Sequence, residues 1–359
     1  MGAGFAALCL GLYVSLLVSS YMKSPAPSCA CDHPSTAGAE GEPLPPTGRP
    51  PAVDAATSTV GGGGREEARQ SAAAFDKGLD VPEWLMGITG LRKQLAANAR
   101  GHVLEVAVGT GRNLAYYDWT GVEAANEERL AGESEGKSGG GTAKAKDSVK
   151  GSANYSGAEL LSFTGVDISA DMMSVARARI RDAVPILKKL MRRRRAEPMP
   201  EAGGTVVDIL DSRVRLCIAD AEAVLPAPPV VDAKQRDAIP AAKYDTIIQT
   251  FGLCSVSDPA KLLSNMASMV QPGSGRIILL EHGRGWYDWV NGLLDRYADP
   301  HYQRYGCWWN RDLESIVREA AQKVPGLEVA KLERPLFLQA GTTLLIELRV
   351  KSAEERDGA

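Results

Sequence analysis

The amino-acid sequence predicts an α/β fold in which seven strands form a doubly wound, mostly parallel sheet. The apolar run 103–108 leads directly into the turn Gly109-Thr110-Gly111, which is typical of a buried strand followed by a ligand-binding turn. Apolar runs recur between helical patterns, and several of them end in an acid. The expected strands are 103–108, 163–167, 214–221, 244–251, 275–284, 327–336 and 342–350, the last two forming an antiparallel hairpin.

The glycine turn is expected to cradle a nucleotide-like ligand, because glycine has no Cβ and lets the backbone come close. A dinucleotide-binding turn needs a third glycine, and Leu114 stands at that position. Glu105 stands four residues before the first glycine. The pattern Glu-x-x-x-Gly-x-Gly resembles the first motif of class I methyltransferases, whose cofactor S-adenosylmethionine carries a positive sulfur. A plain tight turn is the alternative, and Arg112 to Ala115 are expected to open the following helix.

Acids at the ends of later strands favour a cofactor site over a plain turn. Asp167 ends the second strand and can accept hydrogen bonds from ribose hydroxyls, while Ser169 is the expected N-cap of the next helix. Asp220 ends the third strand and can accept from an adenine amino group. The candidate cofactor-binding residues are Glu105, Gly109, Thr110, Gly111, Asn113, Asp167, Ile168, Asp220, Ala221 and Gln249.

Composition limits the possible classes of protein. The chain has 359 residues, of which 44% are hydrophobic and 24% charged, enough for one large core with tails. A net charge of -3 gives no overall attraction to nucleic acid, so no such partner is expected. The six cysteines are dispersed, which excludes a disulfide framework. Cys29-x-Cys31-x-His33 lacks the spacing of the usual zinc patterns, and no metal is expected.

The N-terminal part predicts a membrane anchor. Residues 1–23 contain the uncharged apolar run 3–22, which is long enough to span a bilayer as a helix. A cleaved signal or a matrix presequence is the alternative, but the run has no preceding basic segment and is neither Arg-rich nor amphipathic. Residues 24–70 are rich in Pro and Gly and are expected to form a disordered linker.

A single domain is expected over 71–351, followed by a tail over 352–359. Helices are predicted at 65–75 and 81–98, mainly as core, with Phe75 and Trp84 as alternative lid residues over the cofactor. Polar tracts near 121–155, 192–210 and 226–241 predict disordered insertions. The basic run 192–195 is interpreted as a solvated helix end, with a patch for anionic lipid as the alternative.

The fifth strand ends in charged residues, which places them where ligands bind in an open α/β sheet. His282 is the candidate catalytic base, because imidazole titrates near neutral pH; a structural histidine bonded to backbone is the alternative. Arg284 can hold an anionic acceptor or pair with Glu281. Cys307 is expected to be a buried small hydrophobe rather than a nucleophile. Trp308 and Trp309 are expected to wall the acceptor pocket, to face a partner or to pack in the core.

Four motifs together carry a resemblance to a known family. They are Gly-Thr-Gly-Arg-Asn at 109–113, Gly-Leu-Cys-Ser at 252–255, Leu-Glu-His-Gly-Arg at 280–284 and Gly-Cys-Trp-Trp-Asn-Arg-Asp at 306–312. The chain resembles the mitochondrial methyltransferase-like proteins known as the oxidase assembly mutation suppressor family, and more widely the methyltransferases of ubiquinone and menaquinone biosynthesis. The resemblance covers 75–350 without the insertions. It implies a mitochondrial inner-membrane location and places Glu105, Gly109, Gly111, Asp167 and Asp220 at the cofactor.

We therefore expect a membrane-anchored methyltransferase that uses S-adenosylmethionine and has a link to respiratory-chain or quinone function. The sequence does not identify the methyl acceptor. Its expected partners are the membrane, through the N-terminal helix, and respiratory-chain assembly proteins; another single-pass membrane is the alternative location. A non-catalytic assembly factor with the same fold is the first alternative function. A nicotinamide-dependent oxidoreductase is the second, and Leu114 disfavours it.

Overall fold

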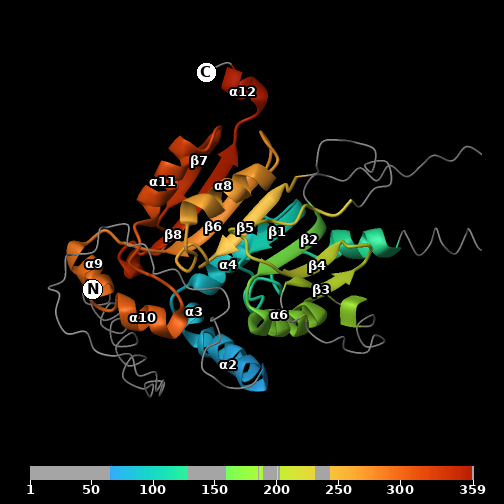
Figure 1. The fold of residues 1–359 in the computed structure, drawn as a ribbon, viewed down its shortest axis with the longest axis horizontal. Coiled ribbons are helices and arrows are strands. Elements are labelled where there is room, and N and C mark those ends of the chain that lie inside the picture. Colours follow the sequence, from blue (N-terminus) through green and yellow to red (C-terminus); the bar gives the residue numbers. More distant parts are fainter. Residues whose placement is uncertain are drawn as a thin grey trace, which may run out of the picture.

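The structure is a computed structural model that describes residues 65–127, 159–184, 186–188, 200, 203–230 and 243–357. Its centre is a mixed sheet with the strand order β3-β4-β2-β1-β5-β6-β8-β7 (Figure 1). The strands are β1 (Gly101–Val106), β2 (Leu160–Asp167), β3 (Gly204–Ile209), β4 (Val214–Ile218), β5 (Thr246–Thr250), β6 (Arg276–His282), β7 (Leu327–Glu333) and β8 (Thr343–Val350).

Five neighbouring strands, β4-β2-β1-β5-β6, are parallel. The chain runs from β1 outward to β2 and β4, then returns to the other side of β1 with β5 and β6. The order therefore reverses beside β1, and a crevice at the carboxyl ends of the strands is expected at such a point. The predicted closing hairpin is confirmed, since β7 and β8 are antiparallel and β8 lies between β6 and β7.

The prediction of seven strands is wrong by one, because the structure has an additional edge strand. Gly204–Ile209, in the tract 192–210 that was expected to be disordered, forms β3 and pairs antiparallel with β4. The connecting turn has positive φ at Leu210, Asp211 and Ser212. Pairing with β4 explains the order of this segment, since it satisfies the backbone groups and covers an otherwise free edge.

Helices cover both faces of the sheet. They are α2 (Arg65–Gly78), α3 (Asp80–Leu85), α4 (Ile88–Ala97), α6 (Ala170–Ala183), α8 (Pro259–Met269), α9 (Asp288–Arg296), α10 (Ala298–Tyr305), α11 (Leu313–Lys323) and α12 (Ala353–Asp357), with a short 3-10 turn, η2 (Phe337–Gln339). Figure 1 shows α8 and α11 along one side of the sheet and α2, α3 and α6 along the other.

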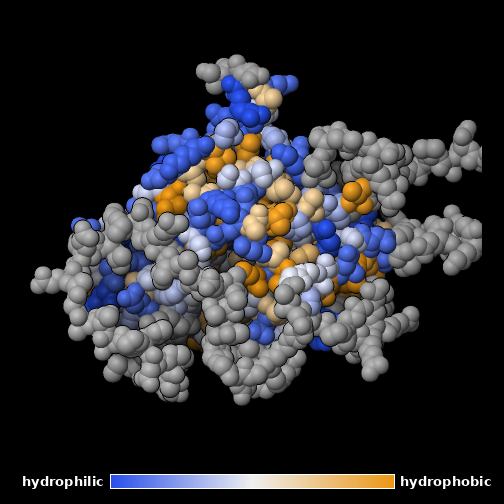
Figure 2. Space-filling model, viewed as in Figure 1, coloured by the Kyte–Doolittle hydropathy of each residue, from blue (hydrophilic) through white to orange (hydrophobic). Residues whose placement is uncertain are grey.

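Alternate side chains of β1 enter two separate cores, as expected for a strand covered on both faces. Val103 packs with residues of α4 and α6, whereas Leu104 and Val106 pack with residues of α8 and α11. Figure 2 shows hydrophilic side chains over the outward sides of α8 and α11, which is typical of amphipathic helices with their apolar sides on the sheet.

Several helix boundaries differ from the prediction. Ser169 accepts from the backbone N–H of Met172 and caps α6, as expected. The predicted helix over 81–98 is divided into α3 and α4 at Gly87, whose φ of 76° belongs to the left-handed region. Residues 109–116 form successive turns rather than the expected opening of a helix. Helical structure begins at 120 and continues to 127, inside the tract 121–155 that was expected to be disordered.

None of the helices in the described part of the chain is long and apolar enough to cross a bilayer. The predicted anchor over 3–22, most of the linker, the basic run 192–195 and the insertion residues 128–155 and 231–241 lie outside that part. Residues 226–230 of the third predicted insertion are described; they form no helix or strand, and Pro228 and Pro229 are buried.

Candidate functional site

The glycine turn and the end of β2 are joined at the carboxyl edge of the sheet. The backbone N–H of Gly109 donates to Oδ2 of Asp167 at 2.8 Å, and the N–H of Ser169 donates to Oδ1 at 2.9 Å. Burial raises the pKa of Asp167, against the effect of these backbone hydrogen bonds. A carboxylate has further lone pairs, so Asp167 can still accept from a ligand hydroxyl.

Glu105, a residue of β1, connects this strand to the segment that follows the glycine turn. Its carboxylate is buried and accepts from Nδ2 of Asn113 and from the hydroxyl of Tyr117, both at 2.8 Å. Burial raises the pKa of Glu105 to about 7. Because both oxygens bond inside the protein, Glu105 and Asn113 are placed to support the turn rather than to protrude from it. Tyr117 was missed by the sequence reasoning.

Thr110 ties the turn to the first helix. It is buried, and its hydroxyl donates to Oδ1 of Asp76 in α2 at 2.6 Å. The same carboxylate accepts from Arg112 and from Arg179 of α6. Burial alone would raise the pKa of Asp76, but hydrogen bonds from Arg179, Thr110 and Arg112 bring it below its ordinary value. The turn is therefore fixed to two helices through one acid.

A second ion pair connects the leading helices to β5. Arg92 of α4 donates to both carboxylate oxygens of Glu83, to Asn113 and to the hydroxyl of Thr250 at distances of 2.8–3.0 Å. Both charged residues are buried. The only sequence signal was a charge within the apolar pattern 81–98. The two leading helices are thus parts of the site's support.

The remaining predicted cofactor residues lie at the same edge in different environments. Ile168 and Asp220 are exposed after β2 and β4, and Asp220 accepts from the N–H of Glu222 at 2.8 Å. Ala221 is half-buried. Gln249 is buried in β5, and its amide atoms have no hydrogen-bond partner among the described residues. Exposed groups beside the turn are available to a ligand.

Two neighbouring strands end in strained backbone. Ala107 after β1 and Phe251 after β5 have positive φ of 53° and 55°. A left-handed conformation costs a residue with a Cβ about 1–2 kcal/mol, and such strain is concentrated at functional sites. The two strands are paired, with Val106 opposite Gln249, so both strained residues lie at one point of the edge.

His282 contacts two cysteines. Its Nε2 lies 2.7 Å from Sγ of Cys307, and the ligand atoms of Cys254, His282 and Cys307 all lie within 4.8 Å of one another. Burial opposes ionisation of Cys254, but the hydrogen bond from Cys307 and the charge of His282 lower its pKa well below the ordinary value. Burial likewise opposes the charged form of His282, and Cys254 raises its pKa. The alternative role predicted for His282 was a hydrogen bond from its ring to the backbone. The contacts found for the ring nitrogen are with sulfur atoms instead.

Cys307 is both a buried residue and a residue whose sulfur contacts other side chains. Cys307 is buried as expected, yet its sulfur is engaged by His282 and Cys254. Burial first, and then the contact with Cys254, raise the pKa of its thiol well above the ordinary value. The cysteine is therefore more than a packing residue.

Arg284 does not pair with Glu281, which corrects one predicted alternative. Arg284 donates to both carboxylate oxygens of Asp295 at 2.8 Å. Glu281 is buried and accepts from the backbone N–H groups of Gly252 and Leu253, and burial raises its pKa to about 8. The acid thus shapes the loop after β5, where its two donors lie.

The tryptophans of the last motif stack on other side chains. Trp308 stacks on Tyr302, with ring centroids 4.5 Å apart. Trp309 stacks on His301 at 3.9 Å, and its indole N–H donates to the carbonyl of Leu294. These contacts favour packing of α9 and α10 among the predicted roles.

The predicted lid residues of the leading helices have different surroundings. Phe75 contacts Tyr305 of α10, with ring centroids 5.9 Å apart. Trp84 is 70% exposed. Of the two, the residue of α2 is the one that joins the N-terminal helices to the C-terminal part of the chain.

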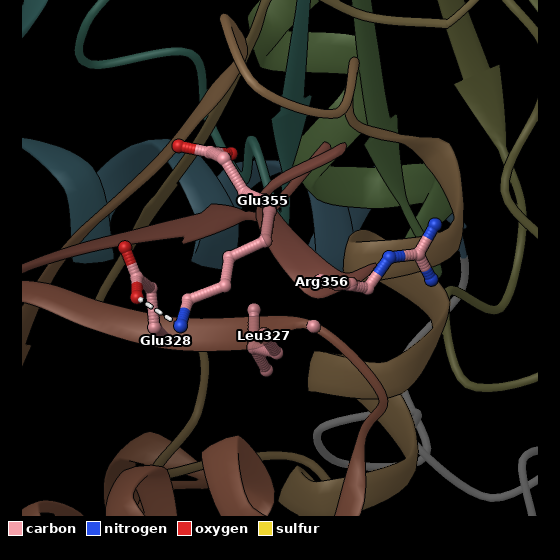
Figure 3. Close-up of a pocket in the computed structure, with 6 residues that line it drawn as sticks. Leu327, Glu328, Glu355 and Arg356 are labelled. Atoms are coloured by element: carbon pink, nitrogen blue, oxygen red, sulfur yellow. Dashed lines mark ion pairs between the residues drawn. The ribbon is translucent and has the colours of Figure 1, made fainter. Parts of the chain in front are cut away.

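A pocket at the opposite edge of the sheet is a poorer candidate. Its lining includes Leu327 and Glu328 at the start of β7 and Glu355 and Arg356 of α12 (Figure 3). The start of β7 lies at the amino edge, away from the glycine turn, and Glu328 is paired with Lys351 at 3.5 Å. Ligands of open α/β sheets bind at the other edge.

Comparison with known proteins agrees with this fold and turn. Residues 87–321 match the protein family described as "Methyltransferase domain", and the chain belongs to this family. The predicted class of enzyme, a methyltransferase, is thereby confirmed.

A relative supports the narrower resemblance. The chain is 30% identical over 252 residues to "Methyltransferase OMS1, mitochondrial" of Saccharomyces cerevisiae, an alignment that covers 70% of this chain and 40% of that protein. The chain therefore spans less than half the length of that relative.

Similar solved structures include an O-methyltransferase family protein from Burkholderia thailandensis, with a TM-score of 0.44 and 15% identity over 80% of this chain and 61% of that one. They also include the complex of the Haloferax volcanii Trm112 methyltransferase activator with a putative methyltransferase, with a TM-score of 0.43 and 14% identity over 79% of this chain and 97% of that one.

Proposed function

We propose that this protein binds S-adenosylmethionine at the glycine turn and transfers its methyl group to an acceptor at the carboxyl edge of the sheet. The observation that carries the proposal is the hydrogen bond from Gly109 to Asp167, which joins the turn and the acid at the carboxyl edge of the sheet. A Cβ added at Gly109 would come no closer than 4.0 Å to other atoms, so the turn leaves open space for a ligand. Asp220 and Ile168 are exposed beside it.

The residues fit a cofactor with an amino-acid tail, a ribose and a base. When bound, it supplies a methyl group already activated by positive sulfur, so the protein's main task is to position it. The backbone of the glycine turn lets the tail approach, Asp167 accepts from hydroxyls, and Glu105 holds the turn in place. His282 is the candidate proton acceptor, and Arg284, already paired with Asp295, is the weaker candidate for the acceptor site.

Calorimetry with the full chain tests the cofactor. S-adenosylmethionine should bind the native protein, bind Asp167→Ala more weakly and fail to bind Gly109→Arg, whose side chain would occupy the open side of the turn. The exposed acid Glu319, which pairs with Lys323 in α11, contacts no residue of the turn, so Glu319→Ala is the matched control and should bind normally. Binding of NAD in place of S-adenosylmethionine would support the oxidoreductase instead.

Transfer is tested separately from binding. Organelle extracts incubated with radioactive cofactor should gain a labelled acceptor only when the native protein is present. Complementation then separates an enzyme from an assembly factor: a deletion strain should not be rescued by stably expressed Gly109→Arg. Full rescue by that variant would support the non-catalytic alternative.

We further propose that the protein works at the mitochondrial inner membrane and acts on a respiratory-chain or quinone-related acceptor. The apolar run 3–22 and the mitochondrial designation of the yeast relative support the location. Exposed aromatic side chains also support it: Trp286, Tyr287, Trp289 and Phe337 are exposed, and Trp286 contacts Tyr287 and Phe337. Tryptophan and tyrosine favour the membrane interface.

Extraction and vesicle binding test these two membrane contacts. Carbonate should leave the full-length protein in the membrane pellet and release a form that starts near Gly64. That shorter form should still bind vesicles, and Trp286→Ser/Trp289→Ser should weaken the binding. Val224→Ser, at another exposed apolar residue, should leave it unchanged. Carbonate release of the full chain would refute an anchor.

A further inference from the structure

Three side chains that sequence spacing does not connect converge at the carboxyl edge of the sheet. Cys254 follows β5, His282 is the last residue of β6, and Cys307 follows α10. We propose that these residues bind one zinc ion through two sulfur atoms and one imidazole nitrogen, with a fourth position open. The arrangement corresponds to zinc sites in which three protein ligands leave one position for a water or a substrate.

The backbone already holds the three segments together. The N–H of Trp308 donates to the carbonyl of Cys254 at 3.0 Å, which fixes the loop of Cys307 against the loop of Cys254. The N–H of Phe251 donates to the carbonyl of Leu280 at 2.8 Å, which fixes the loop of Cys254 beside the end of β6. Preformed geometry is what distinguishes such a cluster from cysteines that only happen to be near.

The three ligand atoms are close enough to share one ion after a small movement. Zinc bonds to sulfur and nitrogen of about 2.3 and 2.1 Å place tetrahedral ligand atoms roughly 3.5–3.8 Å apart. The three ligand atoms here lie within 4.8 Å of one another. Nε2 of His282 and Sγ of Cys307 are 2.7 Å apart, so these two atoms need to separate by roughly 0.8 Å to accept the ion.

The surroundings suit the ion's chemistry and charge. Sulfur ligands select zinc over magnesium or calcium, which prefer oxygen. Two thiolates and a neutral imidazole would neutralise the ion, so the complex adds no net charge to a buried place. Glu281 and Arg311 hold the loop that presents Cys254: the acid accepts from the N–H groups of Gly252 and Leu253, and Nη1 of Arg311 donates to the carbonyl of Leu253 at 2.6 Å. Such surrounding hydrogen bonds orient metal ligands.

The position gives the ion a role that rests on the proposed methyl transfer. The ring of Phe251, which follows β5 beside the glycine turn, lies 5.1 Å from the ring of His282. An acceptor with a lone pair on oxygen, nitrogen or sulfur can take the fourth position, and zinc would lower the pKa of that group. His282 would then act as a ligand and not as a free base.

Metal content of the full chain, purified with a thiol reductant, tests the site without reference to activity. The native protein should contain one equivalent of zinc, and Cys254→Ser and Cys307→Ser should lose it. Cys217→Ser, at a half-buried cysteine of β4, and the N-terminal double variant Cys29→Ser/Cys31→Ser are the controls and should keep the full equivalent. Retention of zinc in the double variant Cys254→Ser/Cys307→Ser would overturn the proposal.

Cobalt substitution of the native protein tests the ligands even if a cysteine variant fails to fold. The cobalt form should show a thiolate-to-metal charge-transfer band and tetrahedral d–d bands, which zinc should displace. The absence of any bound metal in protein with reduced thiols, or a disulfide between Cys254 and Cys307 as the resting state, would also overturn it. Because these measurements need no cofactor, failure of S-adenosylmethionine to bind would be a separate result.

Discussion

The two glycines of the turn differ in what surrounds them. Gly109 and Gly111 both have positive φ, of 55° and 77°. A Cβ at Gly109 would meet open space, whereas a Cβ at Gly111 would lie 2.4 Å from Cδ1 of the buried Leu114 and 3.4 Å from Cα of Ala176. Within the protein itself, the first glycine is therefore required by conformation alone, and the second also by the close packing of Leu114.

This difference predicts unequal losses of stability. Gly109→Ala should lower the free energy of unfolding by about 1 kcal/mol, the cost of a left-handed residue with a Cβ. Gly111→Ala should lower it by about 2–4 kcal/mol, because overpacking adds to the same strain. Urea denaturation of both variants measures the two losses, and equal losses would contradict the packing argument.

The buried acid of β1 predicts a dependence of stability on pH. Burial raises the pKa of Glu105 from 4.5 to about 7, so between these values the folded protein keeps a proton that the unfolded chain releases. The free energy of unfolding should therefore fall as the pH rises through this range, by roughly 3 kcal/mol from this residue.

Glu105→Gln removes the titrating group and keeps acceptors and donors for Asn113 and Tyr117. Urea denaturation at several pH values should give a flatter profile for this variant than for the native protein. Parallel profiles would show that the pKa of Glu105 is close to its ordinary value in the folded state.

At the scale of the elements, α2 is attached to the site mainly by Asp76. Asp76→Ala would leave Arg112 and Arg179 without their shared acid, and the free energy of unfolding should fall by roughly 2–4 kcal/mol. Hydrogen exchange in α2 should rise at the same time. Asp80→Ala is the matched control: its side chain is 62% exposed and pairs with the same Arg112, so its loss should be below about 0.5 kcal/mol.

The elements also show what sequence patterns can and cannot predict. The seven predicted strands are present because apolar runs bounded by glycines and acids are local signals. The strand Gly204–Ile209 was missed because it follows a tract rich in charged and small residues, and its order comes from pairing with β4. The break at Gly87 was missed because a single glycine within a helical pattern is usually tolerated.

Contacts between side chains that are far apart in the sequence could not be predicted from sequence patterns. The acids of the strands and the glycine turn follow from their position at strand ends. Asp76 and Arg179 are 103 residues apart, and neither stands in a motif. Cys254, His282 and Cys307 lie in three different segments with no spacing rule, so only the fold reveals that they meet.

For the whole molecule, the leading helices contact the C-terminal part of the chain over the carboxyl edge. Phe75 of α2 contacts Tyr305 of α10, and Gln339 donates to the carbonyl of Met86. S-adenosylmethionine should therefore slow amide hydrogen exchange in α2, α10 and the glycine turn. The segment 326–328 and α12, at the amino edge, are the internal control and should be unchanged; equal protection at both edges would contradict binding at the carboxyl edge.

The insertion of β8 between β6 and β7 has a consequence for biosynthesis. A chain emerges from the ribosome with its N-terminus first. The strand β6 therefore emerges long before β8 (Thr343–Val350), the strand that pairs with it on the side away from β5. Until then the backbone N–H and C=O groups on that edge of Ile277–Leu280 are unpaired, and β7 has no strand to pair with. A nascent chain of this protein thus exposes a β-edge late in translation, which is the kind of surface that chaperones bind.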